Sequence, residues 1–159
     1  RLAIADQPRF ELDAAEVEAA QQSYTVPTLE RLRQPKVVGT QRPIVLLVGA
    51  DAFAGLAGWH RWTELFELAH IAVAHRPGYP VDAANLPPEL AEVFRTRFRD
   101  DPAALTEAPA GHIVSFAMTQ LDISATRIRE RLSKGQSVRY LLPDALIAHI
   151  HHHHFYTEN

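Results

Sequence analysis

The sequence predicts an α/β domain built on a mostly parallel β-sheet with flanking helices. Segments with the pattern of strands alternate along the chain with segments whose apolar residues have helical spacing. One strand-length run, residues 44–49, is apolar throughout, which is typical of strands buried on both faces of a parallel sheet. The chain has 159 residues, 47% of them hydrophobic, and this predicts a single domain over residues 1–159 with a buried core.

Each element is predicted from local pattern. Residues 10–13 alternate apolar and polar side chains, as a short strand does. Further strands are predicted at residues 44–49, 71–74 and 113–116, and helices at residues 28–33, 62–68, 88–98, 124–132 and 143–150. Gly135 is suited to end the helix that begins near Ser124, and Pro143 is suited to open the last helix.

Composition excludes several classes of function. The net charge of −3 argues against a nucleic-acid polymer as partner, because such a partner requires a broad basic face. No apolar run approaches the roughly 20 residues that span a bilayer, so no membrane partner is expected. The chain has no cysteine, which rules out disulfides and thiol chemistry and fits a cytoplasmic location.

The segment from Ser124 to Arg131 combines a helix start with an unusual charge pattern. Ser124 or Thr126 can cap the helix, because a side-chain hydroxyl accepts a hydrogen bond from an unpaired amide. Arginines follow in the first turns, where the positive end of the helix dipole favours acidic residues. Either these arginines are solvated, or an anion such as phosphate lies at the helix start. The pattern alone favours neither.

Two strand ends carry polar residues that can contribute to a ligand site. Gly49 and Asp51 follow the strand at 44–49, where a carboxylate can bind a ribose hydroxyl or simply cap the next helix. Arg76 follows the strand at 71–74, where a surface turn is the simpler interpretation. Ligands of open parallel sheets bind at the carboxyl ends of the strands, so both places are candidates.

Two tryptophans close together in the sequence receive different interpretations. Trp62 shares helical spacing with Leu65 and Phe66, which predicts that it belongs to the core. Trp59 lies outside that spacing and is followed by His60. Its indole is therefore the better candidate to stack on a flat heterocycle.

The histidines near the C-terminus do not predict a metal site. His149 and His153 are one helical turn apart, which is a spacing found in zinc sites. However, no acidic or thiol ligand lies nearby in the sequence, and a histidine cluster at a chain end is usually solvated. We expect no metal ion to be bound by the protein's own side chains.

Six further segments occur in a recognisable order: residues 23–29, 48–53, 59–65, 69–79, 123–129 and 140–143. The most specific reads Ile123-Ser-Ala-Thr-Arg-Ile-Arg129. Together they resemble the nicotinate-nucleotide adenylyltransferases, nucleotidyltransferases with a Rossmann-like sheet. The resemblance spans nearly the whole chain. It implies adenylyl transfer from ATP to nicotinic acid mononucleotide, which yields deamido-NAD and pyrophosphate in NAD biosynthesis.

The resemblance also implies roles on the ATP side. Ser124, Thr126 and Arg129 would hold the ATP phosphates at a helix start. Ser124 and Arg129 would thereby have a catalytic role in stabilising charge. Arg76 and Gly49 would also lie on the ATP side. Mg²⁺ is expected to accompany ATP.

On the mononucleotide side, the resemblance implies that Trp59 stacks on the nicotinate ring. Backbone amides near His60 and Thr25 would hold the carboxylate of that ring. Asp51 would line the site between the two nucleotides. The partners implied are thus ATP and nicotinic acid mononucleotide, and a homo-oligomer is left open.

One feature of the family does not occur in these residues. The family opens with a strand and a Gly-x-Phe-Asp-Pro-x-His-x-Gly-His loop, whose histidines contact the reacting phosphates. We therefore expect the chain to be about the C-terminal three-quarters of the fold, with the N-terminal strands missing from its sheet. Alone it is expected to be inactive and to expose an edge of its sheet.

Two other functions stay open at this point. One is a nucleotide-binding module without catalytic activity. The other is a related adenylyltransferase that uses a different phosphorylated acceptor, such as the amide mononucleotide or phosphopantetheine.

Overall fold

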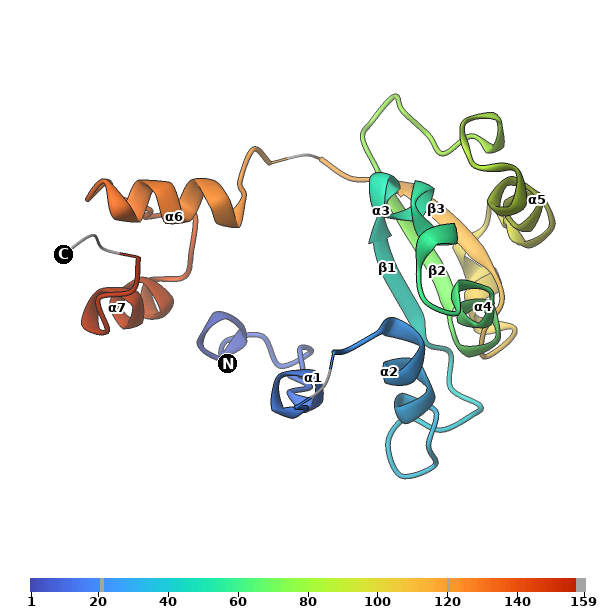
Figure 1. Cartoon of the computed structure of the whole chain (residues 1–159), viewed down its shortest axis with the longest axis horizontal. Coiled ribbons are helices and arrows are strands. Elements are labelled where there is room, and N and C mark those ends of the chain that lie inside the picture. The colour runs from blue at the N-terminus through green and yellow to red at the C-terminus, as the bar shows by residue number, and fades with distance from the viewer. Residues whose placement is uncertain (21, 120, 157–159) are drawn as a thin grey trace. The chain divides into compact units, whose positions relative to one another are not determined.

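A computed structural model describes residues 1–20, 22–119 and 121–156 (Figure 1). The chain divides into two compact units. Residues 16–120 form the sheet unit, and residues 1–15 with 121–159 form the terminal unit. The prediction of one domain over the whole chain stays a prediction, and each unit is described by itself.

The sheet unit is built on three parallel strands, which confirms the α/β class. They are β1 (Val45–Gly49), β2 (His70–His75) and β3 (Ile113–Ala117). Their order in the sheet is β1-β2-β3, and both pairs are parallel. Helices occur between consecutive strands, as in a Rossmann-like fold (Figure 1).

Short helices connect and cover these strands. The α-helices of this unit are α2 (Thr25–Leu32), α3 (Ala50–Ala54), α4 (Leu65–Leu68) and α5 (Pro88–Arg97), with α1 (Ala15–Glu18) at its boundary. Short 3₁₀-helices occupy Leu56–Gly58, Trp62–Glu64, Ala83–Asn85 and Pro102–Thr106. Among the described residues, no helix has the length and apolar character needed to cross a bilayer.

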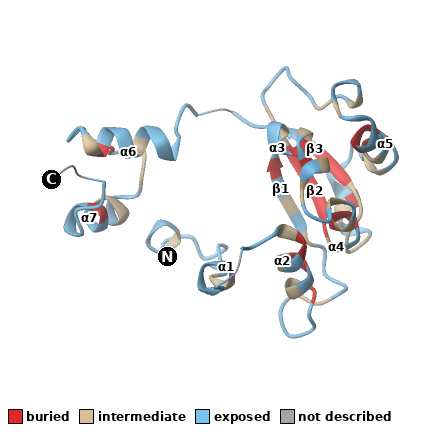
Figure 2. Cartoon of the chain, in the orientation of Figure 1, coloured by how far each residue is buried: buried red, intermediate tan, exposed pale blue. Residues whose placement is uncertain are grey.

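The core lies between one face of the sheet and these helices (Figure 2). The sheet contributes Val48, Ile71, Val73 and Ile113, and the helices contribute Val26, Leu29, Phe53, Leu65, Phe66, Leu90 and Phe94. Alternate residues of a strand point to opposite faces, so only every second strand residue enters this core.

β1 departs from the sequence prediction, which placed it in the interior on both faces. Val48 is 8% exposed, whereas Leu47 on the opposite face is 70% exposed. In the described part of the sheet, β1 has a partner strand on one side only. The prediction of burial on both faces was therefore wrong for this strand.

The hydrogen-bonding edge of β1 that has no partner strand in the described sheet is the exposed edge that was expected.

The strand predicted at residues 10–13 was also wrong. These residues have no regular secondary structure, and the side chains of Phe10 and Leu12 are 64% and 50% exposed. Four alternating residues carry little information when no neighbouring strand provides hydrogen bonds.

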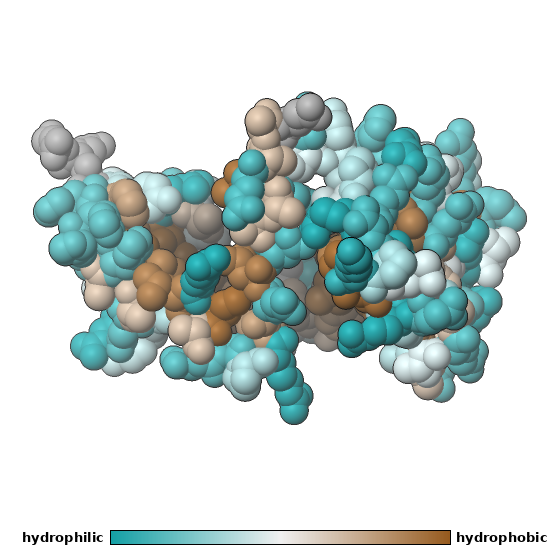
Figure 3. All heavy atoms as spheres, turned by 90° about the horizontal axis from the view of Figure 1, so that it is seen from below, coloured by the Kyte–Doolittle hydropathy of each residue, from teal (hydrophilic) through white to brown (hydrophobic). Residues whose placement is uncertain are grey.

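The terminal unit has a small core of its own. It contains α6 (Ala125–Ser133), α7 (Asp144–His152) and a 3₁₀ turn at Leu2–Ile4. Its buried side chains are Leu132, Val138 and Ile150. Figure 3 shows hydrophobic side chains at the surface of this unit, on the left of that view.

Arg33 joins several loops of the sheet unit. Its side chain is buried just after the end of α2 and, among the described residues, donates its hydrogen bonds to backbone oxygens. The acceptors are the carbonyls of Leu68 (2.8 Å), Gly39 (3.2 Å), Arg42 (2.6 Å) and Pro109 (2.7 Å). Burial lowers the pKa of this guanidinium from its ordinary value. The loops before β1 and β3 are thus tied to the end of α2.

His70 is a second buried polar group at the start of β2. Its Nε2–H donates to the carbonyl of Ala108 (2.8 Å), and its Nδ1 accepts from the amide of His112 (3.0 Å). These two partners fix one neutral tautomer, because a protonated ring has no acceptor atom. Burial is the main cause that lowers the pKa of His70, and the nearby charges of His112 and Arg33 lower it further.

This arrangement predicts that acid destabilises the sheet unit. The pKa of His70 in the folded protein lies below its ordinary value of 6.5. Between these two pKa values, His70 is protonated in the unfolded chain and neutral in the folded protein. The contribution of His70 to stability is complete above that ordinary value and is lost as pH falls from that value through the lower pKa of the folded protein. Urea unfolding followed from about pH 8 to about pH 5.5 should show a falling midpoint.

The variant His70→Gln is the control for this prediction. A glutamine amide can still donate to the carbonyl of Ala108 but does not titrate. We expect the midpoint of this variant to depend less on pH than that of the unmodified protein. Identical pH dependence in the two proteins would contradict the assignment.

Candidate nucleotide-binding site

A pocket lies where the three parallel strands end. Its cavity volume is about 590 Å³. We call it the strand-end pocket, and it is lined by Gly49, Ala50, Asp51, Ala52, Ala74, His75, Arg76, Tyr79 and Met118. Three predicted site residues, Gly49, Asp51 and Arg76, are thus brought together. The position agrees with the rule that open α/β sheets bind ligands at the carboxyl ends of their strands.

The turn from β1 into α3 presents the polar groups of the first strand end. Gly49 occupies the N-cap position of α3 with extended backbone, and no atom lies within 4 Å of an added Cβ. Asp51 lies in the first turn of the helix and is exposed. Asp51 is therefore not the helix cap, and among the described residues its carboxylate makes no hydrogen bond. It is available to a ligand.

The second strand end contributes side chains that sequence reasoning missed. His75 is the last residue of β2, and its Nδ1–H donates to the carbonyl of Arg76 (2.9 Å). The amide of Tyr79 donates to the same carbonyl (3.0 Å), and Gly78 between them has a φ of 83°. This tight turn returns Tyr79 to the pocket, with 74% of its side chain exposed. An aromatic residue after Arg-Pro-Gly was the available signal.

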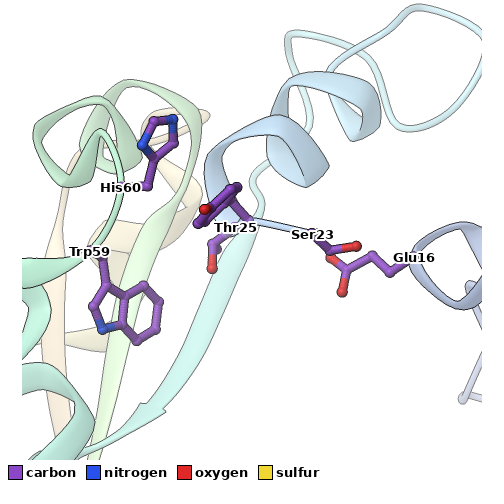
Figure 4. Close-up of a pocket in the computed structure, with 6 residues that line it drawn as sticks. Glu16, Ser23, Thr25, Trp59 and His60 are labelled. Atoms are coloured by element: carbon purple, nitrogen blue, oxygen red, sulfur yellow. The ribbon is translucent and has the colours of Figure 1, made fainter. Parts of the chain in front are cut away.

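A second pocket lies at the start of α2 (Figure 4). Its cavity volume is about 180 Å³. We call it the α2 pocket, and it is lined by Glu16, Ser23, Tyr24, Thr25, Trp59 and His60. Thr25, Trp59 and His60 were predicted to act together, and the structure brings them together.

The two walls of the α2 pocket come from different elements. Ser23 and Thr25 lie on the chain that enters α2, and Trp59 and His60 lie on the loop after the turn Leu56–Gly58 (Figure 4). The indole of Trp59 packs partly against the core and partly lines the pocket. The His60 ring lies 4.6 Å from the ring of Tyr24, between centroids. Trp62 packs edge-on against Phe66 at 6.2 Å, as a core residue does.

The start of α2 lies at this pocket, where Thr25 is part of the lining. Tyr24 occupies the N-cap position, and among the described residues its side chain makes no capping hydrogen bond. Pro27 in the first turn has no amide hydrogen, and Thr25 is the helical residue that lines the pocket, so the amide of Thr25 is the candidate donor to a ligand. Val26 is fully buried and fixes the helix in place. An anion is the natural partner for such a helix start.

Glu16 is a pocket residue that sequence reasoning missed. Its carboxylate accepts a hydrogen bond from the hydroxyl of Thr28 on α2. Both residues are surface residues with no local motif around them, so the pairing depends on the fold. The carboxylate gives the pocket a negative group beside the helix start (Figure 4).

The predicted phosphate-binding residues belong to the terminal unit. Ser124 caps α6, because its Oγ accepts from the amide of Arg127 (3.2 Å). Arg127 is paired with Asp122, and this ion pair lowers the pKa of the aspartate. Arg131 donates to the carbonyl of Ser137 (3.1 Å).

Arg129 is the arginine of α6 that stays available. Within the described part of the chain, neither its guanidinium nor the hydroxyl of Thr126 has a hydrogen-bond or ion-pair partner. Both residues are exposed. Of the arginines Arg127, Arg129 and Arg131, Arg129 is therefore the candidate for binding phosphate.

The histidines at the end of α7 contact one another as aromatic rings. The centroids of His149 and His153 lie 4.4 Å apart, and the ring of Phe155 lies 5.4 Å from that of His153. Among the described residues, no group of three or more histidine, aspartate or glutamate side chains is placed to hold a metal ion.

Known proteins resemble this chain along its whole length. The pattern of the cytidylyltransferase-like family matches residues 1–131. A probable nicotinate-nucleotide adenylyltransferase of Dechloromonas aromatica (strain RCB) is 58% identical over 159 residues, which are 100% of this chain and 72% of the relative. The chain belongs to the nicotinate-nucleotide adenylyltransferase family. It is therefore a member of a family of nucleotidyltransferases with the Rossmann-like fold predicted above.

Two further comparisons support this family assignment. The probable nicotinate-nucleotide adenylyltransferase of Pseudomonas putida (strain W619) is 42% identical over 156 residues, covering 98% of this chain and 68% of the relative. The structure of Plasmodium falciparum nicotinic acid mononucleotide adenylyltransferase complexed with NaAD matches with a TM-score of 0.52 at 12% identity. That match covers 86% of this chain and 58% of the other, and it supports the fold.

Proposed function

We propose that this chain carries nucleotide-binding sites of an enzyme that transfers the adenylyl group of ATP to nicotinic acid mononucleotide. The products are deamido-NAD and pyrophosphate. The observation that carries this proposal is the α2 pocket, which combines the indole of Trp59 with the N-terminal end of a helix at Thr25. A flat ring that bears a carboxylate matches both features.

The α2 pocket is proposed to hold the nicotinate ring. Trp59 offers its indole as a stacking surface, because part of the ring lines the cavity. The amide of Thr25 and the backbone near His60 would receive the ring carboxylate. An uncharged amide on the ring would gain less from the positive end of α2, so the acid is the expected substrate.

The strand-end pocket is proposed to hold parts of both nucleotides. Its larger volume suits a nucleotide, and Gly49 lets the ligand approach the backbone closely because it has no side chain. Asp51 would bind between the two nucleotides, and Arg76 would face ATP. The start of α6, with Ser124 and Arg129, would bind the ATP phosphates.

The reaction transfers the adenylyl group in one displacement. A 5′-phosphate oxygen of the mononucleotide attacks the α-phosphorus of ATP, and the bond to the β-phosphate oxygen breaks as pyrophosphate leaves. The residues of the chain position the two nucleotides and neutralise phosphate charge, which is most of what such chemistry requires.

Mg²⁺ is proposed to enter with ATP as part of that substrate. Asp51 is the carboxylate of the strand-end pocket, and Mg²⁺ in nucleotide sites is commonly held by one or two carboxylates, water and substrate phosphates. That coordination fits a site without a metal cage made by the described side chains. A cytoplasmic location is proposed as well, in agreement with a chain that has no cysteine.

The deciding experiment measures pyrophosphate release from ATP. The whole gene product that contains this chain is assayed with nicotinic acid mononucleotide, its amide, and phosphopantetheine as acceptors. We expect release with the acid mononucleotide and much less with the others. Preference for another acceptor would leave the nucleotidyltransferase family intact and overturn the substrate. Binding of ATP without any transfer would favour a non-catalytic module.

Arg129→Ala tests the proposed phosphate site on α6. A charge-assisted hydrogen bond contributes about 1.5–3 kcal/mol, so kcat/KM for ATP should fall by about tenfold or more. The matched control is Arg131→Ala on the same helix, because Arg131 already binds the carbonyl of Ser137. Equal kinetics of the Arg129 variant and the unmodified enzyme towards ATP would refute the assignment.

A further inference from the structure

We propose that Arg61 sets the width of the α2 pocket by joining its two walls, and so acts as a positioning residue for the mononucleotide. This inference rests on the proposed function of that pocket. Arg61 is not part of the cavity lining. It follows His60 directly and lies two residues after Trp59, so it belongs to the same loop as these two lining residues.

The Arg61 guanidinium binds two carboxylates from different elements. Its Nη2 lies 2.6 Å from Oε1 of Glu30 on α2 and 2.5 Å from Oε2 of Glu64, and its Nε lies 2.8 Å from Oε1 of Glu64. Glu64 belongs to the same loop as Arg61, in the turn Trp62–Glu64. Glu30 belongs to the helix whose first residue, Thr25, lines the opposite wall. One side chain therefore connects the loop to the helix.

The backbone of Arg61 adopts an unusual conformation that neighbouring turns hold in place. Its φ is 56°, in the left-handed region that residues other than glycine rarely adopt. Turns on both sides hold this conformation: the amide of Trp62 donates to the carbonyl of Trp59, and the amide of Glu64 donates to that of Arg61. A left-handed arginine at this point reverses the chain and directs its side chain back towards α2.

The chemistry of the pair of carboxylates requires arginine. The planar guanidinium presents five donors and can bind two carboxylates at once, whereas a lysine ammonium acts as a single compact charge. The ion pair with Arg61 lowers the pKa of Glu64, so this carboxylate accepts its hydrogen bonds in the charged form.

The exposure of these groups indicates that the ion pairs position the pocket walls rather than stabilise the fold. The side chains of Arg61, Glu30 and Glu64 are 36%, 45% and 43% exposed. Exposed ion pairs contribute little to the free energy of unfolding. A network that spans two walls of a pocket can still fix their separation, and small displacements of binding groups strongly affect ligand complexes.

The test uses Arg61→Gly, because glycine accepts the left-handed backbone without strain and removes the guanidinium. In the whole gene product, this variant should raise KM for nicotinic acid mononucleotide about tenfold and leave KM for ATP unchanged. The double variant Glu30→Gln with Glu64→Gln should show the same pattern. The KM of Arg61→Lys should be intermediate, since lysine can keep one of the two ion pairs.

A second measurement is hydrogen exchange without ligand. The backbone amides of residues 58–62 should exchange faster in Arg61→Gly.

The matched control is Arg95→Ala, which removes an exposed arginine paired with Glu92 on α5 at 3.3 Å. It should change neither KM. Failure of the unmodified protein to bind the mononucleotide overturns the proposed function, and this inference with it. Binding by the unmodified protein with an unchanged KM in Arg61→Gly overturns this inference alone. So does an equal rise in KM for both substrates.

Discussion

Replacing Trp59 by alanine should raise KM for nicotinic acid mononucleotide about tenfold or more, since stacking of a base on an aromatic side chain contributes about 1–3 kcal/mol. KM for ATP should change little, because Trp59 lines the α2 pocket and not the strand-end pocket. Steady-state kinetics with each substrate varied in turn measures both constants. Trp59→Phe should retain part of the affinity, because a smaller aromatic face remains.

Trp62→Phe is the control for the Trp59 prediction. Trp62 packs edge-on against Phe66 and against the core, and it does not line the α2 pocket. This variant should lower stability slightly and leave KM for the mononucleotide unchanged. The stacking role of Trp59 is wrong if Trp59→Ala affects both substrates to the same extent.

Arg33→Ala should destabilise the sheet unit by about 3 kcal/mol or more. The substitution leaves four carbonyls without their donor, at Leu68, Gly39, Arg42 and Pro109, at a position where the side chain is largely shielded from water. Buried acceptors that lose a partner destabilise the folded state by their desolvation, which is a larger effect than the loss of an exposed bond. Urea unfolding monitored by tryptophan fluorescence measures the loss.

Arg33→Lys separates the geometry of the donors from their charge. A lysine keeps the positive charge but presents its donors at one point, so it cannot reach four carbonyls that surround a planar guanidinium. We expect a stability between those of the unmodified protein and of Arg33→Ala. A stability equal to that of the unmodified protein would show that the charge alone matters.

The parallel sheet could be predicted because the residues of β2 and β3 carry their own signal. Runs such as Ile71 to Ala74 are short, apolar and bounded by turn residues, and helical spacing separates them. Trp59 could be singled out for the same kind of reason, because it breaks the spacing that assigns Trp62 to the core. Local pattern was enough for these residues, since their roles depend on near neighbours in the chain.

Other features could not be predicted because they depend on contacts between distant segments. Arg33 binds Pro109, which lies 76 residues away, and Arg61 binds Glu30, which lies 31 residues away. Glu16 enters the α2 pocket only through the folded position of α2. An arginine or glutamate in isolation reads as a solvated residue, and only the fold gives it a partner.

The alternation along β1 has a consequence for how its residues can change. Val48 belongs to the core, so substitutions there are limited by folding of the sheet unit. Leu47 is mostly exposed on the opposite face, and a polar residue there removes little buried surface from this unit. Selection for a folded unit therefore acts strongly on one residue and weakly on its neighbour. Within this unit, a polar substitution should therefore be tolerated at Leu47 and not at Val48.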